Sequence, residues 1–338
     1  MGKNKKTVCD TVGLDIGSYS VKLVSLGKRP DEETLRAYNI KKIPPKSDIS
    51  QIKDIVKESL KEVSLFPDEV NLSLSGPDVI VRFINLPKMK KDQLENALVY
   101  EAEKYIPFNV NEVILDSIIL GDAQENGQMK VLLAAAKREF VDSQINMLKE
   151  IGIKIRVMDI ASFAAFNAFS WSHELPDEEV SAFINIGHSQ TDVLVFFGGN
   201  PCFMRQIQVG GKKIADMISK ELSIAEEDVE EYIMDQKEGS EEDIKRVMGH
   251  VTKELVKELH LSFGYFENRY NKRVDKIYCT GGIVSQKNVI ELFREEIGLD
   301  IKKWDPIGQI KLADTISEDD ISSVSSQLAV AIGLALRD

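Results

Sequence analysis

Two stretches of this chain repeat one pattern about 170 residues apart, at 12–26 and 182–196. In each, apolar residues alternate on both sides of a Gly/Ser turn, which is typical of a strand, a tight turn and a second strand. An internal repeat of this kind predicts a molecule built from two similar halves. Duplicated α/β halves leave a crevice between their sheets, and such crevices bind ligands.

The turn of the first stretch has a composition suited to phosphate. Gly17 tolerates a positive φ, and Gly17 and Ser18 would present backbone N–H groups and a hydroxyl into one concavity. Asp15 would direct a carboxylate there, suited to a hydrated Mg²⁺, and Lys22 would add a positive charge. The alternative is an ordinary hairpin in which Asp15 and Ser18 make only local hydrogen bonds. These residues alone leave both interpretations open.

The length and charge of the chain narrow the class of protein. With 338 residues, two domains or one large bilobed domain are expected. A net charge of −12 argues against nucleic-acid binding, because a polyanion requires a basic face. The three cysteines and four histidines show no metal-ligand spacing, and no apolar run reaches the roughly 18 residues of a membrane span. We therefore expect a cytoplasmic protein without direct membrane insertion.

The rest of the chain divides where the hydrophobic pattern breaks. Gly76-Pro77 and Gly152 bracket a small α/β unit, and the polar connector 175–179 marks a boundary between lobes. Besides the two hairpins, strands are expected at 34–43, 70–74, 79–86, 113–120, 129–136, 153–158, 200–209 and 276–280. Helices are expected at 49–63, 91–105, 138–151, 162–168, 214–222, 225–234, 241–270, 286–296 and 323–336.

Two glycine pairs complete an ordered set of elements. Gly210-Gly211 forms a corner after a strand, and Gly281-Gly282 separates a strand from a helix whose N-terminus would face a nucleotide. Two inward-facing turns, one from each lobe, would grip phosphates from opposite sides. The second glycine pair would then offer a flat backbone platform for adenosine.

This order of two hairpins and two glycine corners resembles the actin, sugar kinase and Hsp70 superfamily. Within it, the chain closely resembles the PilM family of type IV pilus assembly proteins, relatives of the cell-division protein FtsA. The resemblance covers nearly the whole chain, and Glu101–Phe108 (EAEKYIPF) is its most family-specific part. The other matching stretches are Gly13–Ser18, Val21–Leu23, Leu86-Pro87, Arg205–Gly211, Thr280–Gly282 and Ala331–Ala335.

The resemblance implies an α/β, actin-like fold, in which a ribonuclease H-like unit is duplicated into two lobes and an FtsA-type subdomain is inserted. The first lobe would take residues 1–77 and 153–178, with part of the C-terminal helix 323–338. Residues 78–152 would form the inserted, partner-binding subdomain. The second lobe would take 179–213 and 274–322, and residues 214–273 would form its helical subdomain.

The resemblance also implies ATP bound with Mg²⁺ between the lobes. Asp15 would hold Mg²⁺ through water. The other residues implied at the nucleotide are Gly17, Ser18, Tyr19, Ser20, Lys22, Asn185, Gly187, His188, Ser189, Gln190, Thr191, Gly210, Gly211, Lys213, Gly281, Gly282 and Ile283. Asp159 is a candidate for polarising the attacking water, and the alternative is that it caps the helix at 162–168.

One departure from the family pattern concerns hydrolysis. The second hairpin of this superfamily usually carries an acidic residue before its Ile-Gly, and this chain has Asn185 there. An amide can hydrogen-bond water, but it cannot neutralise Mg²⁺ or act as a base. We therefore expect ATP binding with slow hydrolysis at most.

The family role is that of a cytoplasmic adaptor in the inner-membrane complex of type IV pilus assembly. It would bind the cytoplasmic N-terminal peptide of the membrane protein PilN and would be peripheral to the inner membrane through that partner. Other inner-membrane pilus components and weak self-association are further expectations. Residues implied in a peptide groove are Leu74, Val81, Arg82, Leu98, Glu101, Tyr105, Ile106 and Phe108. The alternative is that these residues only form the core of the subdomain.

Two other functions of the same superfamily stay open at this point. A small-molecule, sugar-type kinase would use Asp159 as a base, and phosphate release stimulated by a sugar would reveal it. An FtsA-like, filament-forming division protein would sediment with ATP and lipid vesicles.

Overall fold

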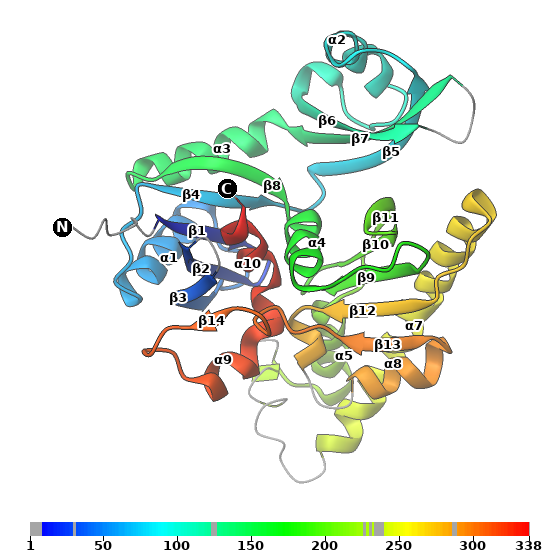
Figure 1. Ribbon diagram of the computed structural model, residues 1–338. Helices are drawn as coiled ribbons and strands as arrows, with labels where there is room; N and C mark the ends of the chain where they lie inside the picture. Colours follow the sequence, from blue (N-terminus) through cyan, green and yellow to red (C-terminus); the bar gives the residue numbers. More distant parts are fainter. Residues whose placement is uncertain are drawn as a thin grey trace, which may run out of the picture.

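The computed structural model describes residues 9–29, 32–122, 127–225, 228–229, 232, 240–285 and 289–337. Its strands form three sheets (Figure 1). The first sheet has the strand order β14-β3-β2-β1-β4-β8, and the second has the order β11-β10-β9-β12-β13. The first sheet contains β1 (Cys9–Ile16), β2 (Ser20–Arg29), β3 (Glu32–Lys42), β4 (Glu69–Leu74), β8 (Lys154–Ile160) and β14 (Lys311–Leu312). The second contains β9 (Val180–Ile186), β10 (Thr191–Phe197), β11 (Asn200–Ile207), β12 (Lys276–Thr280) and β13 (Asp300–Lys303).

The two large sheets share one topology. In each, three antiparallel strands follow one another, and the first of them also pairs in parallel with the fourth strand. The fifth strand then pairs in parallel with the fourth. The order third-second-first-fourth-fifth is therefore repeated, with β14 added at one edge of the first sheet. This repetition confirms the expected duplicated, actin-like α/β fold.

Two helices cover the outer face of the first sheet, α1 (Ile49–Glu62) and α3 (Arg138–Glu150). The start of α1 is fixed by a capping box, in which the Asp48 carboxylate accepts from the Gln51 amide at 2.9 Å and Gln51 bonds back. Val56 and Leu60 of α1 then pack into a core with strand residues such as Leu14 and Leu23. The expected apolar stripe of this helix accounts for that packing.

Two helices rich in small residues lie side by side between the two sheets, α4 (Ala161–Ser172) and α10 (Ala329–Leu336) (Figure 1). They approach so closely that a Cβ on Gly333 would lie 1.8 Å from the carbonyl oxygen of Ala164. A Cβ on Gly13 of β1 would similarly lie 2.0 Å from the Ala331 carbonyl oxygen. Both distances are far inside van der Waals contact, so glycine is required where the lobes join.

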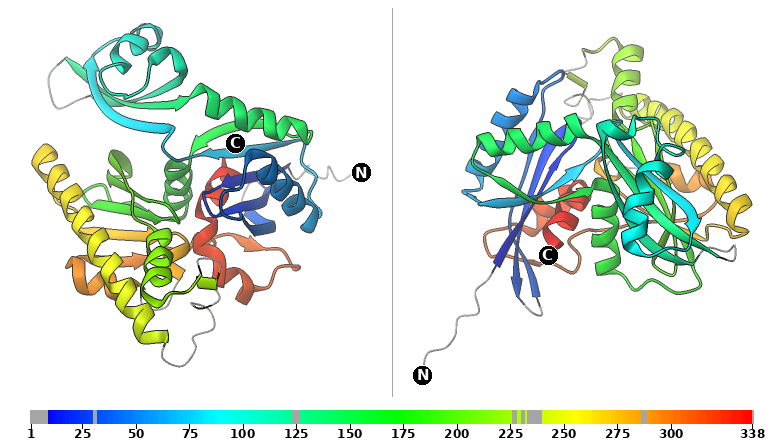
Figure 2. Two further views of the ribbon diagram at one scale, coloured as in Figure 1. Left: turned by 180° about the vertical axis from the view of Figure 1, so that it is seen from behind. Right: turned by 90° about the horizontal axis from the view of Figure 1, so that it is seen from above.

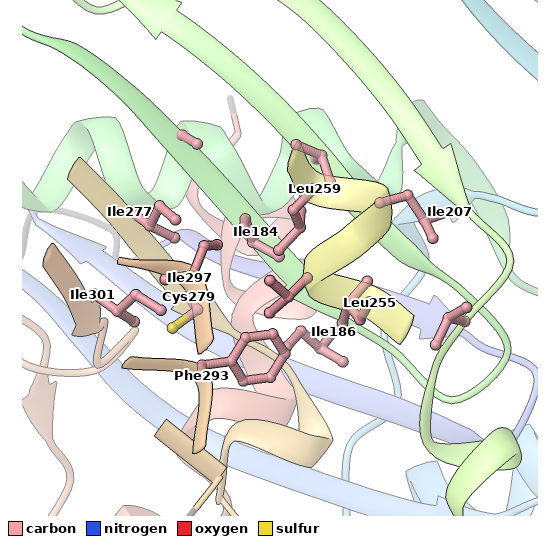
Figure 3. Close-up of a cluster of buried hydrophobic side chains, with 14 of the residues drawn as sticks. Ile184, Ile186, Ile207, Leu255, Leu259, Ile277, Cys279, Phe293, Ile297 and Ile301 are labelled. Carbon is pink, nitrogen blue, oxygen red and sulfur yellow. The ribbon is translucent and has the colours of Figure 1, made fainter. Parts of the chain in front are cut away.

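The second lobe carries α5 (Gly211–Leu222), α7 (Ser240–Tyr270) and α8 (Val289–Ile297) against its sheet. Figure 3 shows how Ile184, Ile277 and Ile301 from three neighbouring strands meet Leu255 and Leu259 of α7 and Phe293 and Ile297 of α8. This core is separate from the one formed by α4, α10 and the inner strand faces. This core fixes the base of the second hairpin and the position of the 3₁₀ turn η3 (Gly282–Ser285).

A third unit is inserted in the chain between β4 and β8. It contains β5 (Val79–Pro87), α2 (Lys91–Ala102), the 3₁₀ turn η1 (Val110–Glu112), β6 (Val113–Asp122) and β7 (Gln128–Lys137). Its sheet has the order β5-β7-β6, and α2 packs on one face of that sheet. In the left view of Figure 2 this unit projects at the top of the molecule, whereas in the right view it overlaps the second lobe.

Several boundaries differ from those expected. The helix expected at 91–105 ends at Ala102, three residues before the end expected ahead of Pro107. The last helix is broken into α9 (Glu318–Val324), the 3₁₀ turn η4 (Ser325–Leu328) and α10. β14, expected in the second lobe, pairs instead with β3 of the first. Most of the helix expected at 225–234 lies outside the described residues.

Candidate functional site

The two Gly/Ser turns lie next to each other, one from each lobe. The first is closed by the Gly17 amide donating to the Ser20 carbonyl at 3.1 Å, and the second by the Gly187 amide donating to Gln190 at 2.9 Å. The rings of Tyr19 from the first turn and His188 from the second stack with their centroids 4.5 Å apart. The expected meeting of the two turns is therefore present in the structure.

Asp15 is held rigidly at the end of β1. Its buried carboxylate accepts from the Ser73 hydroxyl at 2.7 Å and forms an ion pair with Lys22 Nζ at 3.0 Å. Because β1 and β4 pair in parallel through Leu14 and Leu72, Asp15 and Ser73 lie side by side on the inner face of the sheet. Ser73, which the sequence analysis did not single out, therefore positions the carboxylate expected near Mg²⁺.

Asp192 is a second carboxylate at this place, and the sequence analysis missed it. It lies on β10 directly opposite Asn185 and is buried. Gln190 donates to it at 2.9 Å, yet burial and the nearby Asp15 charge together raise its pKa to about 6. An aspartate within the apolar run of a buried strand was the signal in the sequence.

The second turn is docked onto the start of α5. The Gly211 amide donates to the Gly187 carbonyl at 3.0 Å, and the Lys212 amide donates to the His188 carbonyl at 2.7 Å. A Cβ on Gly210 would lie 2.6 Å from both of these carbonyl oxygens, so this approach requires glycine. Thr191 fixes the other side of the corner, because its hydroxyl donates to the Val209 carbonyl at 2.7 Å. The exposed hydroxyl at the tip of this turn belongs to Ser189.

The second glycine pair reaches the same place. Gly281 has a φ of 108°, and its amide donates to the Ser326 carbonyl at 3.1 Å. A Cβ on Gly281 would lie 2.8 Å from the Asn185 side-chain oxygen, and one on Gly211 would lie 2.7 Å from Ile283. Gly210–Gly211 and Gly281–Ile283 therefore line the crevice beside the second turn.

Other residues implied by the resemblance lie around these groups. Ser20 is buried beside the first turn, whereas Ser18 at its tip is exposed, like Ser189 across the crevice. Lys213 is exposed on α5 and pairs with Glu254 of α7 at 3.4 Å. Lys213 is thus already engaged by a carboxylate of the helical subdomain.

The chemistry of this crevice fits a magnesium nucleotide. Asp15 and Asp192 repel each other in a buried place, and a divalent cation would relieve that repulsion. The exposed hydroxyls of Ser18 and Ser189 provide polar groups that can approach phosphate. In the described residues, no three His, Cys, Asp or Glu side chains cluster as a direct metal cage.

Asp159 lies beside Ser73 in the parallel pairing of β4 with β8, on the same row as Asp15. Its carboxylate forms an ion pair with Arg337 and accepts from the Ile160 amide. Burial raises the pKa of Asp159, and the Arg337 charge opposes that rise. The N-cap residue of α4 is Ile160, without a side-chain cap, so the alternative that Asp159 caps this helix is wrong.

Residues expected in the peptide groove fall in two places. Leu98 and Ile106 are buried between α2 and the inserted sheet, and Tyr105 and Phe108 pack against that core. Glu101 pairs with Lys104 at 2.8 Å.

The other expected groove residues lie where the inserted unit joins the first lobe. Leu74 is buried there with Val79 and Val141. Val81 is also buried, whereas Arg82 is exposed and donates to the Val81 carbonyl at 2.9 Å. The two groups therefore do not form one continuous apolar surface.

Comparisons with known proteins bear on this site. A family model described as type IV pilus assembly protein PilM matches residues 13–338. The chain is similar to a structure of the PilM-PilN type IV pilus biogenesis complex, at 26% identity and a TM-score of 0.88 over 98% of this chain and 99% of that one.

Two more distant structures share the fold alone. One is the ethanolamine utilization protein EutJ from Carboxydothermus hydrogenoformans, at 12% identity and a TM-score of 0.58 over 98% of this chain and 91% of that one. The other is a non-polymerisable quadruple mutant of pCBH ParM, at 14% identity and a TM-score of 0.50 over 96% and 98%. The actin-like fold implies nucleotide binding. Because the family model spans almost the entire sequence, the chain belongs to the type IV pilus assembly protein PilM family.

Proposed function

We propose that this protein is an ATP-binding adaptor of the type IV pilus inner-membrane assembly complex and that it binds the cytoplasmic N-terminal peptide of PilN. The single observation that carries the nucleotide part is the meeting of the two turns, seen in the stacking of Tyr19 on His188. The partner part rests on the family and on the similarity to a PilM-PilN complex. No helix among the described residues is long and apolar enough to cross a membrane. We place the protein in the cytoplasm, attached to the inner membrane through PilN.

In this proposal, the nucleotide phosphates lie between the two turns. Backbone amides and the hydroxyls of Ser18 and Ser189 bind phosphate oxygens, and Lys22 adds positive charge beside Asp15. Mg²⁺ supplies charge neutralisation at the phosphates, and Asp15 and Asp192 hold its water ligands. The glycine platform of Gly281-Gly282 faces the adenosine.

The catalytic part of the proposal is a slow ATPase at most. Asn185 cannot serve as a base, and the Asp159 carboxylate is already paired with Arg337. Asp159 remains our candidate for orienting a water, and that role requires Arg337 to release it. Nucleotide binding without fast turnover suits a protein whose role is to change its affinity for a partner.

We assign peptide binding to the inserted unit. Arg82 is exposed on β5, and beside α2 Tyr105 and Phe108 have partly exposed rings that can anchor apolar side chains. The domain boundaries given above, with residues 78–152 as the partner-binding subdomain, belong to this proposal.

Calorimetric titration with a peptide copying the PilN N-terminus, with and without Mg·ATP, tests the proposal. We expect binding in both conditions, with an affinity that depends on nucleotide. Arg82→Ala should weaken it, whereas Lys53→Ala, in an exposed ion pair of α1, should leave it unchanged. Absence of any heat in both conditions would remove the adaptor function.

A further inference from the structure

The inserted unit has an apolar groove along the edge of its sheet. This edge groove, of about 490 Å³, runs between α2 and β6. Five consecutive residues of β6, Leu115–Ile119, line it. Successive side chains of a strand point to opposite faces, so a groove that touches five in a row follows the backbone edge itself.

The edge is open for pairing. β6 is the last strand of the order β5-β7-β6, and within the described residues it pairs only with β7. The Ser117 amide donates to the carboxylate of the neighbouring Asp116 at 2.8 Å, and not to another strand. An unpaired strand edge is a template for an added strand, and natural proteins place charged side chains at such edges to prevent unwanted pairing. Asp116 is a charged residue of this kind.

The walls of the edge groove are apolar and unusually exposed. Leu94 and Leu98 of α2 form its floor, while Val99 is 44% exposed, Ile118 57% and Ile119 41%. Exposed large apolar residues on two adjacent elements mark an interaction site more than scattered single ones do. An apolar floor beside a free backbone edge suits an extended segment with alternating apolar side chains.

The charged residues that line the edge groove favour one kind of binding partner. Glu95 and Asp116 line the edge groove with Lys91, and within the part of the chain that the structure describes no ion pair engages any of the three. A second copy of this chain would bring the same two carboxylates, on a protein of net charge −12, against each other. A segment bearing lysine or arginine would be attracted instead.

We propose that the edge groove is a second docking site, which accepts an extended peptide from another protein as a strand added to β6. Apolar side chains of the peptide face α2, and they alternate with lysine or arginine residues that face Asp116 on the opposite side of the sheet. Arg82, Tyr105 and Phe108 do not line the edge groove, and Leu98, the one residue that it shares with the expected PilN peptide site, is buried. The proposal therefore uses none of the exposed residues assigned to PilN.

The experiment uses the full chain with labelled isoleucine methyl groups and a short probe peptide in which isoleucine alternates with lysine. We expect methyl shifts at Ile118 and Ile119 on titration, and slower hydrogen exchange along β6. A peptide with glutamate in place of lysine, and one with a central proline, should bind at least about tenfold more weakly. Equal binding of the glutamate peptide, or shifts only elsewhere, would overturn the proposal.

Variants distinguish strand addition to β6 from nonspecific hydrophobic binding. Asp116→Lys should weaken binding of the lysine probe at least about tenfold and improve binding of the glutamate probe. Val99→Glu provides a second test on the α2 wall, in case Asp116→Lys disturbs the fold. Tyr100→Ser, exposed on α2 but outside the edge groove, is the matched control and should change nothing. Methyl shifts that depend on protein concentration without peptide would show that a second copy covers the groove and would overturn the proposal.

Discussion

At the scale of single residues, the crevice is shaped by two carboxylates that differ in their partners. Asp15 is bonded by Ser73 and paired with Lys22, so its charge is compensated. Asp192 has amide donors from Gln190 and Gln206 but no cation, and burial with the nearby Asp15 charge raises its pKa to about 6. A folded-state pKa above the unfolded value of about 3.9 means that ionised Asp192 destabilises the fold. This contribution disappears when the group is protonated.

We predict that Asp192→Asn stabilises the nucleotide-free protein in a pH-dependent way. The gain in unfolding free energy should be near zero at pH 4 and should rise between pH 4 and 6, because Asp192 ionises in the unfolded state at a lower pH than in the folded state. Above pH 6 the gain should level off. Its full size follows from a shift of about two pH units and is roughly 3 kcal/mol. Urea unfolding at pH 4.5, 6 and 8 measures it. A gain that is the same at every pH would show that electrostatics is not the cause.

At the scale of elements, helices α4 and α10 approach each other so closely at Gly333 that their backbones are in contact. A Cβ on Gly333 would meet the Ala164 carbonyl at 1.8 Å, so neither helix can accept even one methyl group there. Gly264, in the middle of α7, has no neighbouring atom within 4 Å of its would-be Cβ. The two glycines thus differ in their surroundings while sharing a helical backbone.

Substituting each glycine by alanine should therefore have opposite effects. Gly333→Ala should destabilise the protein by about 3 kcal/mol or more, because the overpacked methyl group must separate the helices. Gly264→Ala should stabilise it by about 0.5–1 kcal/mol through helix propensity. Guanidinium chloride unfolding compares the two variants. A Gly333→Ala protein as stable as the wild type would contradict the close crossing.

The same scale shows what could be predicted from the sequence. The alternation of apolar residues and the glycine in each turn predicted both hairpins, because these signals lie within a short stretch of sequence. The break of the last helix at Ser325–Leu328 was not predictable, since it depends on a distant contact. There, the Ser326 carbonyl leaves the helical ladder and accepts from Gly281 and from the Thr280 hydroxyl.

The site was predictable to a similar extent. The turn residues follow from composition and from the resemblance. Ser73 and Asp192 required knowledge of which strands pair, because each acts through a residue on another strand. Asp159 was located in the chain, but its partner Arg337 is 178 positions away and gives no local signal.

At the scale of the whole molecule, the inserted unit touches both lobes. It is covalently part of the first, and β5 also contacts β11 of the second. Lys130 of β7 places its amino group 5.1 Å from the ring centroid of Tyr270 and 5.6 Å from that of Phe83. Burial lowers the pKa of Lys130, which is half-buried at this contact. The Tyr270 hydroxyl in turn donates to the Cys202 carbonyl at 2.9 Å.

We predict that this contact couples nucleotide and peptide binding. In the wild type, saturating Mg·ATP should change peptide affinity at least about fivefold, and peptide should change ATP affinity by the same factor. In the Lys130→Ala protein, each ligand should change the affinity for the other by a factor close to one. Lys88→Ala, which removes an exposed ion pair with Asp122 on the same unit, is the control and should keep the wild-type factor. Unchanged coupling in Lys130→Ala would show that the signal takes another route.

Calorimetric titration of Mg·ATP tests most directly whether the two turns hold a nucleotide between them. The proteins compared are the wild type, Ser18→Glu, Ser189→Glu and the control Ser50→Glu, since all three serines are exposed and their replacement spares the core. A carboxylate at either turn tip should repel the triphosphate and weaken binding at least about tenfold, or roughly 1.4 kcal/mol, whereas Ser50→Glu should bind like the wild type. Wild-type affinity in either turn variant would contradict the account.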